Sequence, residues 1–190
     1  MAGLIVVIFG LMGTGKSTLA DALAKAKGWP VIHSDLVRKQ LAGLEPTVAV
    51  VEEFGQGIYS EAFSRKTYAE MLRQARQLLA KAPVVILDGS FKRAAERERV
   101  RQAAREWGAK PLFVYCECPK ETVRRRLVKR TADGSSVSDG RLELLDLQEK
   151  DFDPLGEKDR PLLRLDTGRD LESAVTEVLD FLAKELSSQS

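Results

Sequence analysis

The chain has 190 residues, of which 44% are hydrophobic and 31% charged, and 30 basic residues nearly balance 28 acidic ones. This composition is typical of one globular domain spanning residues 1–190, and it excludes disordered and fibrous classes. A net charge of +2 neither implies nor excludes nucleic acid as a partner. No apolar run reaches the ~18 residues that span a bilayer, so the protein is expected to be cytoplasmic, without a membrane partner.

A phosphate-binding pattern, G-x-x-x-x-G-K-[ST], is matched at every fixed position by residues 10–17, GLMGTGKS. The apolar, mostly β-branched run over residues 4–9 predicts a buried strand before it, and the helix formers over residues 17–26 predict a helix after it. The glycines allow successive backbone N–H groups to converge on an anion, and the positive end of the helix adds to that attraction. The motif therefore has the strand–loop–helix context that it requires.

This motif predicts a nucleoside triphosphate site with ATP and Mg²⁺ as cofactors. Lys16 is expected to reach the β- and γ-phosphates, and the Ser17 hydroxyl to bind the Mg²⁺ that bridges them. The alternative is a glycine-rich turn that happens to carry a lysine, but both flanking elements argue against it. The expected nucleotide contacts from this region are Gly10, Met12, Gly13, Thr14, Gly15, Lys16, Ser17 and Thr18.

A second strand is predicted over residues 29–33, followed at once by Ser34, Asp35 and a helical pattern over residues 36–41. If the strands are parallel, Asp35 lies on the same rim as the phosphate loop and is the candidate general base. Capping of the helix by Ser34 or Asp35 is the open alternative, and the two roles are compatible. Arg38 would face the same side and hold the acceptor, although such a residue taken alone is more often solvated.

Residues 43–57 combine proline and glycine with no clean period, which predicts a loop covering the pocket. Helical spacing then runs over residues 58–82 and stops at Pro83. Tyr59 is a candidate for the acceptor pocket, although aromatic residues at helical spacing more often belong to the core.

A third buried strand, over residues 84–88, ends in Asp88, which is expected to hold the metal opposite the phosphate loop. Gly89 follows where many mechanical ATPases carry a glutamate that polarises water. Gly89 in place of that glutamate favours transfer of the phosphoryl group to a bound hydroxyl over hydrolysis.

Lys92 and Arg93 leave the same strand end and are candidate substrate contacts. They lead into a helix predicted over residues 94–107, on which Glu96, Arg99, Arg101 and Arg105 are expected to form a solvated face.

A fourth strand is predicted over residues 111–116, and Pro119 suits the first turn of the helix that follows over residues 120–130. Cys116 and Cys118 are interpreted as strand residues poorly placed for a disulfide. Arg126 and Arg130 share a face of the helix.

The Gly-, Ser- and Asp-rich segment over residues 131–140 has the composition of a mobile lid, so that a lid is placed at about residues 126–141. Arg126 and Arg130 on it would stabilise charge on a transferring phosphoryl group, whereas in isolation the basic run is simply a solvated face.

The carboxyl-terminal part contains a helical pattern over residues 141–148, a polar loop over residues 151–161 and a fifth strand over residues 162–166. Arg169 turns from the end of that strand toward the nucleotide side. A last helix opens near Asp170 and precedes a Ser-rich tail.

With these residues assigned, the chain resembles the small P-loop kinases of the nucleoside monophosphate kinase-like group. Within that group it is most similar to polynucleotide 5′-hydroxyl kinases, zeta toxin and chloramphenicol phosphotransferase, and to the ATP-binding domain often fused to an aminoglycoside-phosphotransferase-like domain. The likeness covers nearly the whole chain, and the segments that carry it are SDLVRK over 34–39, GIYS over 57–60, LDGSF over 87–91 and SDGR over 138–141.

The resemblance implies an α/β fold with three layers, in which a five-stranded parallel sheet of order 2-3-1-4-5 has helices on both faces. It also implies that Asp35 is the general base and that Arg38 contacts the acceptor, as the matching residues do in polynucleotide kinase relatives. The chain lacks the acceptor signatures of gluconate, shikimate and adenylate kinases, so the acceptor stays open.

Two functions follow from this reading. The first is a kinase that transfers the γ-phosphoryl group of ATP to a hydroxyl of a small molecule, a nucleoside or nucleotide, or a polynucleotide 5′ end, acting as a monomer or homodimer. The second is an ATP-binding regulator or adaptor with weak ATPase activity.

Overall fold

The computed structural model describes residues 3–48, 55–132 and 139–187, without the side chains of residues 130–132 and 139–143. A five-stranded parallel sheet runs in the order β2-β3-β1-β4-β5, which confirms the order expected from the resemblance. The strands are β1 (Leu4–Gly10), β2 (Val31–His33), β3 (Val84–Asp88), β4 (Lys110–Glu117) and β5 (Leu162–Asp166).

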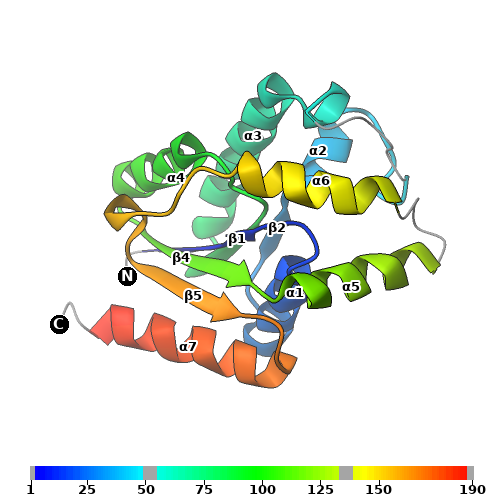
Figure 1. Cartoon of the computed structure of the whole chain (residues 1–190). Coiled ribbons are helices and arrows are strands. Elements are labelled where there is room, and N and C mark those ends of the chain that lie inside the picture. Colours follow the sequence, from blue (N-terminus) through cyan, green and yellow to red (C-terminus); the bar gives the residue numbers. More distant parts are fainter. Residues whose placement is uncertain (1–2, 49–54, 133–138, 188–190) are drawn as a thin grey trace.

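Helices cover both faces of this sheet (Figure 1). They are α1 (Lys16–Lys27), α2 (Ser34–Leu41), α3 (Glu61–Leu79), α4 (Ala94–Trp107), α5 (Lys120–Ala132), α6 (Asp139–Lys150) and α7 (Leu171–Ser187). Two 3₁₀ turns, η1 (Gly57–Tyr59) and η2 (Glu157–Asp159), lie between them. Within the described ranges, no helix is long and apolar enough to cross a membrane.

Strand β1 is buried along its whole length, and its alternating side chains divide the core into two layers. Leu4, Val6 and Ile8 pack with apolar residues of α1 and α7. Ile5, Val7 and Phe9 pack with apolar residues of α3 and α4 on the opposite face. The central strand is therefore held from both sides, which fixes the position of the loop that leaves its carboxyl end.

The expected bounds of β3, α4 and β5 are confirmed, and the other elements differ from prediction by a few residues at their ends. The helix predicted over residues 58–82 is instead the 3₁₀ turn η1 followed by α3. Ser60 explains the break, because it is the N-cap of α3 and its hydroxyl accepts the Phe63 N–H.

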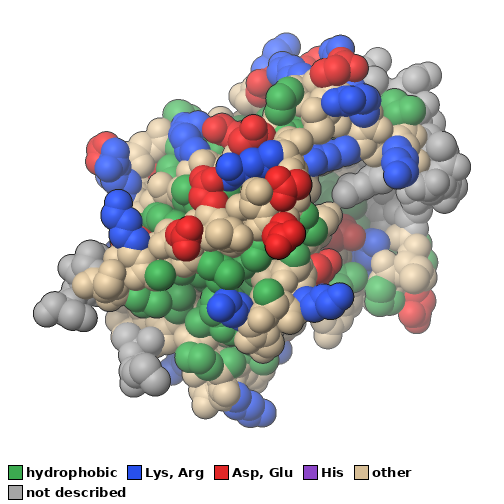
Figure 2. All heavy atoms as spheres, turned by 90° about the horizontal axis from the view of Figure 1, so that it is seen from below, with side chains coloured by type: hydrophobic (Ala, Val, Ile, Leu, Met, Phe, Trp, Pro, Cys, Tyr) green, Lys and Arg blue, Asp and Glu red, His purple; other side chains and the backbone are tan. Residues whose placement is uncertain are grey.

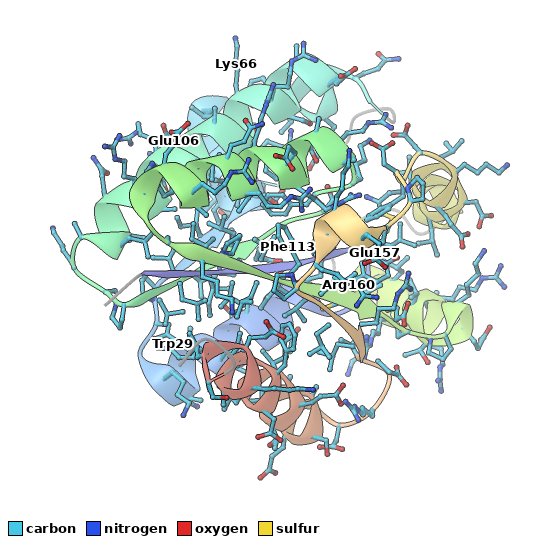
Figure 3. The ribbon with its side chains drawn as sticks, turned by 90° about the vertical axis from the view of Figure 1, so that its left-hand side faces the viewer. Trp29, Lys66, Glu106, Phe113, Glu157 and Arg160 are labelled. Carbon is cyan, nitrogen blue, oxygen red and sulfur yellow. The ribbon has the colours of Figure 1, made fainter. Side chains whose placement is uncertain are left out.

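The prediction of a solvated charged face on α4 is wrong for Glu96 and Arg101, which are 6% and 9% exposed, whereas Arg99 and Arg105 are exposed. Glu96 is buried because its carboxylate accepts the Arg93 N–H at the start of the helix. Arg101 is buried because its guanidinium lies 5.2 Å from the centre of the Phe113 ring and 3.4 Å from Asp159. Figure 3 shows Phe113 in the interior, beneath α4.

Arg97 is the most deeply buried charge of α4, with 0% exposure. Its Nε donates to Asp159 Oδ1 at 2.7 Å, and its guanidinium lies 5.8 Å from the Phe9 ring centre and 5.7 Å from that of Phe152. Burial alone would raise the pKa of Asp159, but hydrogen bonds from Arg97 and the Gly156 amide lower it below its usual value. This ion pair joins α4 to the segment that returns from α6.

We predict that Asp159→Asn destabilises the fold by about 3–5 kcal/mol, because it leaves the Arg97 charge buried without its counter-ion. The matched control is Glu157→Gln, which removes an exposed pair with Arg160 on the same turn and should cost at most about 1 kcal/mol. Figure 3 shows Glu157 and Arg160 close together on the side that faces the viewer. Urea unfolding measures both, and equal losses would contradict the prediction.

The pH dependence of stability follows from the same ion pair. Because the pKa of Asp159 is lowered in the folded protein, the contribution of the ion pair to the free energy of unfolding should be complete above the ordinary pKa of 3.8 and should be lost as the pH drops below it.

Candidate functional site

The phosphate loop connects the carboxyl end of β1 to the first turn of α1, and close approach of other segments explains its glycines. A Cβ on Gly10 would lie 2.5 Å from the Cys116 carbonyl oxygen, and one on Gly13 would lie 2.8 Å from Val123 Cγ1. Gly13 and Gly15 also have positive φ angles of 72° and 84°. The loop is therefore shaped by its surroundings as well as by any ligand.

Two side chains of the loop are anchored on the loop itself. Lys16 Nζ donates to the Leu11 carbonyl oxygen at 2.6 Å, and Thr14 Oγ1 donates to the same oxygen at 2.8 Å. The ammonium group thus lies over the loop that is expected to hold phosphates, and a phosphate would compete with the Leu11 carbonyl for it.

Ser17 and Asp88 meet as the sequence predicts. The Ser17 hydroxyl donates to Asp88 Oδ2 at 2.6 Å, and this carboxylate is 4% exposed. The other oxygen, Asp88 Oδ1, is buried and has no hydrogen-bond partner within the described ranges. An orphaned carboxylate oxygen beside a hydroxyl fits Mg²⁺, which prefers oxygen ligands and keeps several waters or phosphate oxygens. The described residues hold no cluster of three or more metal-ligating side chains.

His33 also contacts Asp88, and this was not predicted from the sequence. His33 Nδ1 lies 2.8 Å from Asp88 Oδ2, and His33 Nε2 lies 3.2 Å from Asp21 Oδ1. The hydrogen bond to Asp88 is the largest cause that raises the pKa of His33 above 6.5, and partial burial opposes it. The signal in the sequence was a histidine at a strand's carboxyl end, directly before Ser34 and Asp35.

Asp35 lies in the first turn of α2, and its side chain is 55% exposed and 3.0 Å from Lys39 Nζ. The N-cap of this helix is His33, so neither Ser34 nor Asp35 occupies the capping position that the sequence left open. A negative charge in the first turn is favoured by the helix dipole. Asp35 thus combines access to solvent with an adjacent cation, two residues from the contact between His33 and Asp88.

Arg38 is buried, with 7% exposure, although it was considered as a solvated residue. Its Nη1 donates to the carbonyl oxygen of Ile58 and, at 3.2 Å, to the Ser64 hydroxyl. The guanidinium carbon lies 5.2 Å from the centre of the Tyr59 ring, which is 36% exposed. Arg38 and Tyr59, both acceptor candidates, therefore lie together between α2 and η1.

Lys92 and Arg93 lie in a different arrangement. Lys92 Nζ is 2.6 Å from Asp151 Oδ2, and Arg93 is 2.5 Å from Asp151 Oδ1 and 3.3 Å from Asp153. These ion pairs hold the segment that follows α6. Their assignment as substrate contacts stays a prediction, and a substrate would have to compete with these carboxylates.

The turn between β3 and α4 is strained at Phe91, a buried non-glycine residue with a φ of 40°. Hydrogen bonds hold it: the Phe91 N–H donates to the Tyr68 hydroxyl at 3.0 Å, and Arg97 donates to the Phe91 carbonyl at 2.9 Å. Burial raises the pKa of Tyr68 to about 12, so this hydroxyl stays protonated near neutral pH. The strained turn sets the path of the chain directly after Asp88.

A cavity of about 360 Å³ opens beside the phosphate loop. Arg126 lies at this cavity and donates to the Thr167 carbonyl oxygen at 2.6 Å, while the Thr167 hydroxyl donates to the Thr14 carbonyl. Arg169 also lines the cavity and is paired with Glu177. Arg130 belongs to α5, but its side chain lies outside the described residues. The lining residues are Gly15, Thr18, Leu19, Arg126, Lys129, Thr167, Arg169, Leu171 and Ala174.

Helices α5 and α6 pack directly on the phosphate loop. Leu11 and Met12 contact a small apolar cluster formed by Val123, Leu127 and Leu145. In addition, the Met12 N–H donates to the side-chain oxygen of Gln148 at 2.6 Å. The variable positions of the motif are therefore the surface on which α5 and α6 pack.

The fold and the site define a P-loop nucleotide-binding domain with the architecture of small kinases. The chain belongs to the family described as an AAA domain, which residues 5–155 match. An uncharacterized protein of Mycobacterium tuberculosis is 30% identical over 149 residues, which are 78% of this chain and 30% of that protein. The chain therefore spans only about 30% of the length of this relative.

Kinases are among the similar proteins. A shikimate kinase of Rhodopseudomonas palustris is 28% identical over 128 residues, which are 67% of this chain and 56% of that protein. A gluconokinase from Sinorhizobium meliloti 1021 superposes with a TM-score of 0.68 and 25% identity, covering 99% of this chain and 97% of that chain. The APS kinase of Mycobacterium tuberculosis, solved with AMPPNP and APS, has a TM-score of 0.64 and 21% identity over 96% of this chain and 98% of that chain, which shows the fold alone. The narrower likeness to polynucleotide kinases and zeta toxin stays a prediction.

We predict that Gly13→Ala destabilises the protein more than Gly28→Ala. Both positions have a positive φ, 72° and 69°, so both substitutions carry the left-handed strain of about 1–2 kcal/mol. Only Gly13 lies against another segment, whereas nothing lies within 4 Å of a Cβ at Gly28. The clash with Val123 should add about 1–3 kcal/mol in denaturant unfolding.

The second substitution Val123→Ala should recover most of that added loss in the Gly13→Ala background, because it removes the clashing methyl groups. Equal effects of Gly13→Ala and Gly28→Ala would show that α5 does not press on the phosphate loop.

Proposed function

We propose that this chain is an ATP- and Mg²⁺-dependent kinase that transfers the γ-phosphoryl group to a hydroxyl of an acceptor molecule. The observation that carries the proposal is the placement of three groups after neighbouring parallel strands: the phosphate loop after β1, Asp88 at the end of β3 in contact with Ser17, and the accessible carboxylate of Asp35 in the helix that follows β2. The kinases among its relatives and structural neighbours support the class of reaction.

The positions of these groups support a separate proposed role for each of them. The backbone N–H groups over residues 10–18 and Lys16 hold the terminal phosphates of ATP. Ser17 and Asp88 would hold Mg²⁺, which would supply a positive charge that withdraws electrons from the phosphate oxygens. The cavity lined by Arg126, Arg169 and Leu171 is proposed to receive the nucleoside, since it opens directly beside Gly15 and Thr18.

In the transfer step, Asp35 orients the acceptor hydroxyl and takes its proton as the acceptor oxygen bonds to the γ-phosphorus. The bond between that phosphorus and the β–γ bridging oxygen breaks, and ADP leaves with the bridging oxygen. Lys16 neutralises charge that develops on the phosphates, and Arg126 and Arg130 are proposed to assist from the lid. Gly89, in place of a water-polarising glutamate, supports transfer over hydrolysis.

The acceptor is proposed to bind between α2, η1 and the β3–α4 turn. Arg38 and Tyr59 lie in contact there, and Lys92 and Arg93, which pair with Asp151, directly precede α4. Figure 2 shows the face on which α7 lies, on the other side of the molecule, with basic and acidic side chains interspersed among apolar ones. A small hydroxyl-bearing acceptor is supported by the shikimate kinase and the gluconokinase to which the chain is similar, and a polynucleotide 5′ end is the less supported acceptor.

The first test is an ATP-consumption assay across acceptor pools: sugars and sugar acids, shikimate, nucleosides, aminoglycosides and oligonucleotides with free 5′ hydroxyls. We expect one pool to stimulate ADP formation well above the rate without acceptor. If every pool leaves the basal rate unchanged while the folded protein binds ATP, the kinase proposal is wrong.

With that acceptor, Asp35→Asn should lower transfer by about 10²- to 10⁴-fold, the usual contribution of a general base, with ATP affinity within about twofold of the wild type. Asp180→Asn, an exposed acid on α7 across the sheet, is the control and should change neither quantity. An unaffected transfer rate in Asp35→Asn would remove this residue from the mechanism.

Arg126→Met should raise the dissociation constant of ATP by about tenfold, because Arg126 lines the cavity proposed for the nucleotide and a hydrogen bond to a charged group contributes about 1.5–3 kcal/mol. Its neighbour Arg125 is exposed and donates only to Thr122 within the described contacts. Arg125→Met is thus a matched control, expected to stay within about twofold. Calorimetry that finds the two variants alike would exclude the cavity as the nucleoside site.

A further inference from the structure

His33 and Asp88 are direct neighbours across the β2–β3 pair, so their side chains leave the carboxyl edge of the sheet together. Asp88 Oδ2 takes two donors: the Ser17 hydroxyl at 2.6 Å and His33 Nδ1 at 2.8 Å. Asp88 Oδ1 takes none within the described ranges, although it is buried. The two oxygens of one carboxylate are therefore in different environments.

The structure assigns His33 as a positioning residue for the metal carboxylate, a role that rests on the proposed function of Ser17 and Asp88. Two donors on Oδ2 restrict rotation of the carboxylate and leave Oδ1 as the oxygen available to Mg²⁺. Partners that orient a metal-binding carboxylate in this way commonly change metal affinity by about 10- to 100-fold when removed.

Asp21 completes the arrangement. Its carboxylate lies 3.2 Å from His33 Nε2, and it is placed four residues after Ser17 on α1, so both project from one face of that helix. Helix α1 thus supplies both Ser17, which contacts Asp88, and Asp21, which contacts His33. Both ring nitrogens of His33 therefore face carboxylate oxygens, Nδ1 that of Asp88 and Nε2 that of Asp21.

The role differs from that of a base or a substrate contact. Both ring nitrogens of His33 are engaged by Asp88 and Asp21, and the ring side chain is only 21% exposed. A group held at both nitrogens is suited to fix its neighbours in place. Removal of the His33 ring should therefore raise the Mg²⁺ concentration that ATP binding requires, with a smaller effect on the rate of phosphoryl transfer.

The test compares His33→Leu with His33→Asn, because asparagine can place an N–H donor near the position of Nδ1 and leucine cannot. Calorimetry measures the ATP affinity with and without Mg²⁺. It also gives the Mg²⁺ concentration at which half of the Mg²⁺-dependent increase in ATP affinity is reached. We expect His33→Leu to raise this concentration by about 10- to 100-fold while ATP affinity without metal stays within about twofold. His33→Asn should stay within about threefold of the wild type.

Asp21→Asn is the second variant, and it changes an exposed side chain that the fold does not need. It should raise the half-saturating Mg²⁺ concentration by at most about fivefold, the ceiling for an exposed ion pair. Because His33 is the only histidine of the chain, its imidazole NMR signals are unambiguous, and they should shift when Mg²⁺ is added with ADP.

An unchanged Mg²⁺ requirement in His33→Leu would overturn this assignment while leaving the kinase proposal intact. Equal losses of ATP affinity with and without metal would also overturn it, because they would indicate a purely structural role. A folded wild type that binds no triphosphate would overturn both proposals.

Discussion

The hydrogen bond between Ser17 and Asp88 is the contact on which the account of this protein depends. It joins the first turn of α1 to the end of β3, two elements separated by 71 residues in the sequence. The buried sheet makes the contact possible, because β1 and β3 pair in parallel and end at one edge. The other groups with proposed roles are neighbours of this pair in the fold: the phosphate loop directly precedes Ser17, and Asp35 follows β2, the strand beside β3.

The lid region is coupled to the same place by packing. Leu11 and Met12, which occupy variable positions of the phosphate-binding motif, are covered by apolar residues of α5 and α6. Gln148 adds a hydrogen bond to the Met12 N–H. A displacement of α5 or α6 must therefore disturb the loop, so that nucleotide binding and the position of these helices are linked by contact.

Much of this architecture could be predicted from the sequence, because local patterns determine it. Spacing and residue type alone predict the motif over residues 10–17, the strand β3, which is apolar up to Asp88, and the bounds of α4. The burial of Glu96 and Arg101 could not be read in this way. Helical periodicity identifies one apolar face, whereas these side chains are buried by α4 capping, the Phe113 ring and Asp159.

The contact between His33 and Asp88 was also beyond a reading of local pattern. It requires β2 to lie beside β3, and that order is a property of the whole sheet. The hydrogen bond from Met12 to Gln148 spans 136 residues and has no signature in either segment. Sequence thus predicts the groups proposed to carry chemistry, and the tertiary structure adds the groups that contact them.

Calorimetric titration with ATP, with and without Mg²⁺, decides whether Asp88 holds the metal when it is applied to the wild type and to Asp88→Asn. We expect Mg²⁺ to tighten ATP binding to the wild type, and Asp88→Asn to lose this effect while it still binds metal-free ATP. Triphosphate binding that is absent in the folded wild type, or equally dependent on Mg²⁺ in both proteins, would contradict this expectation.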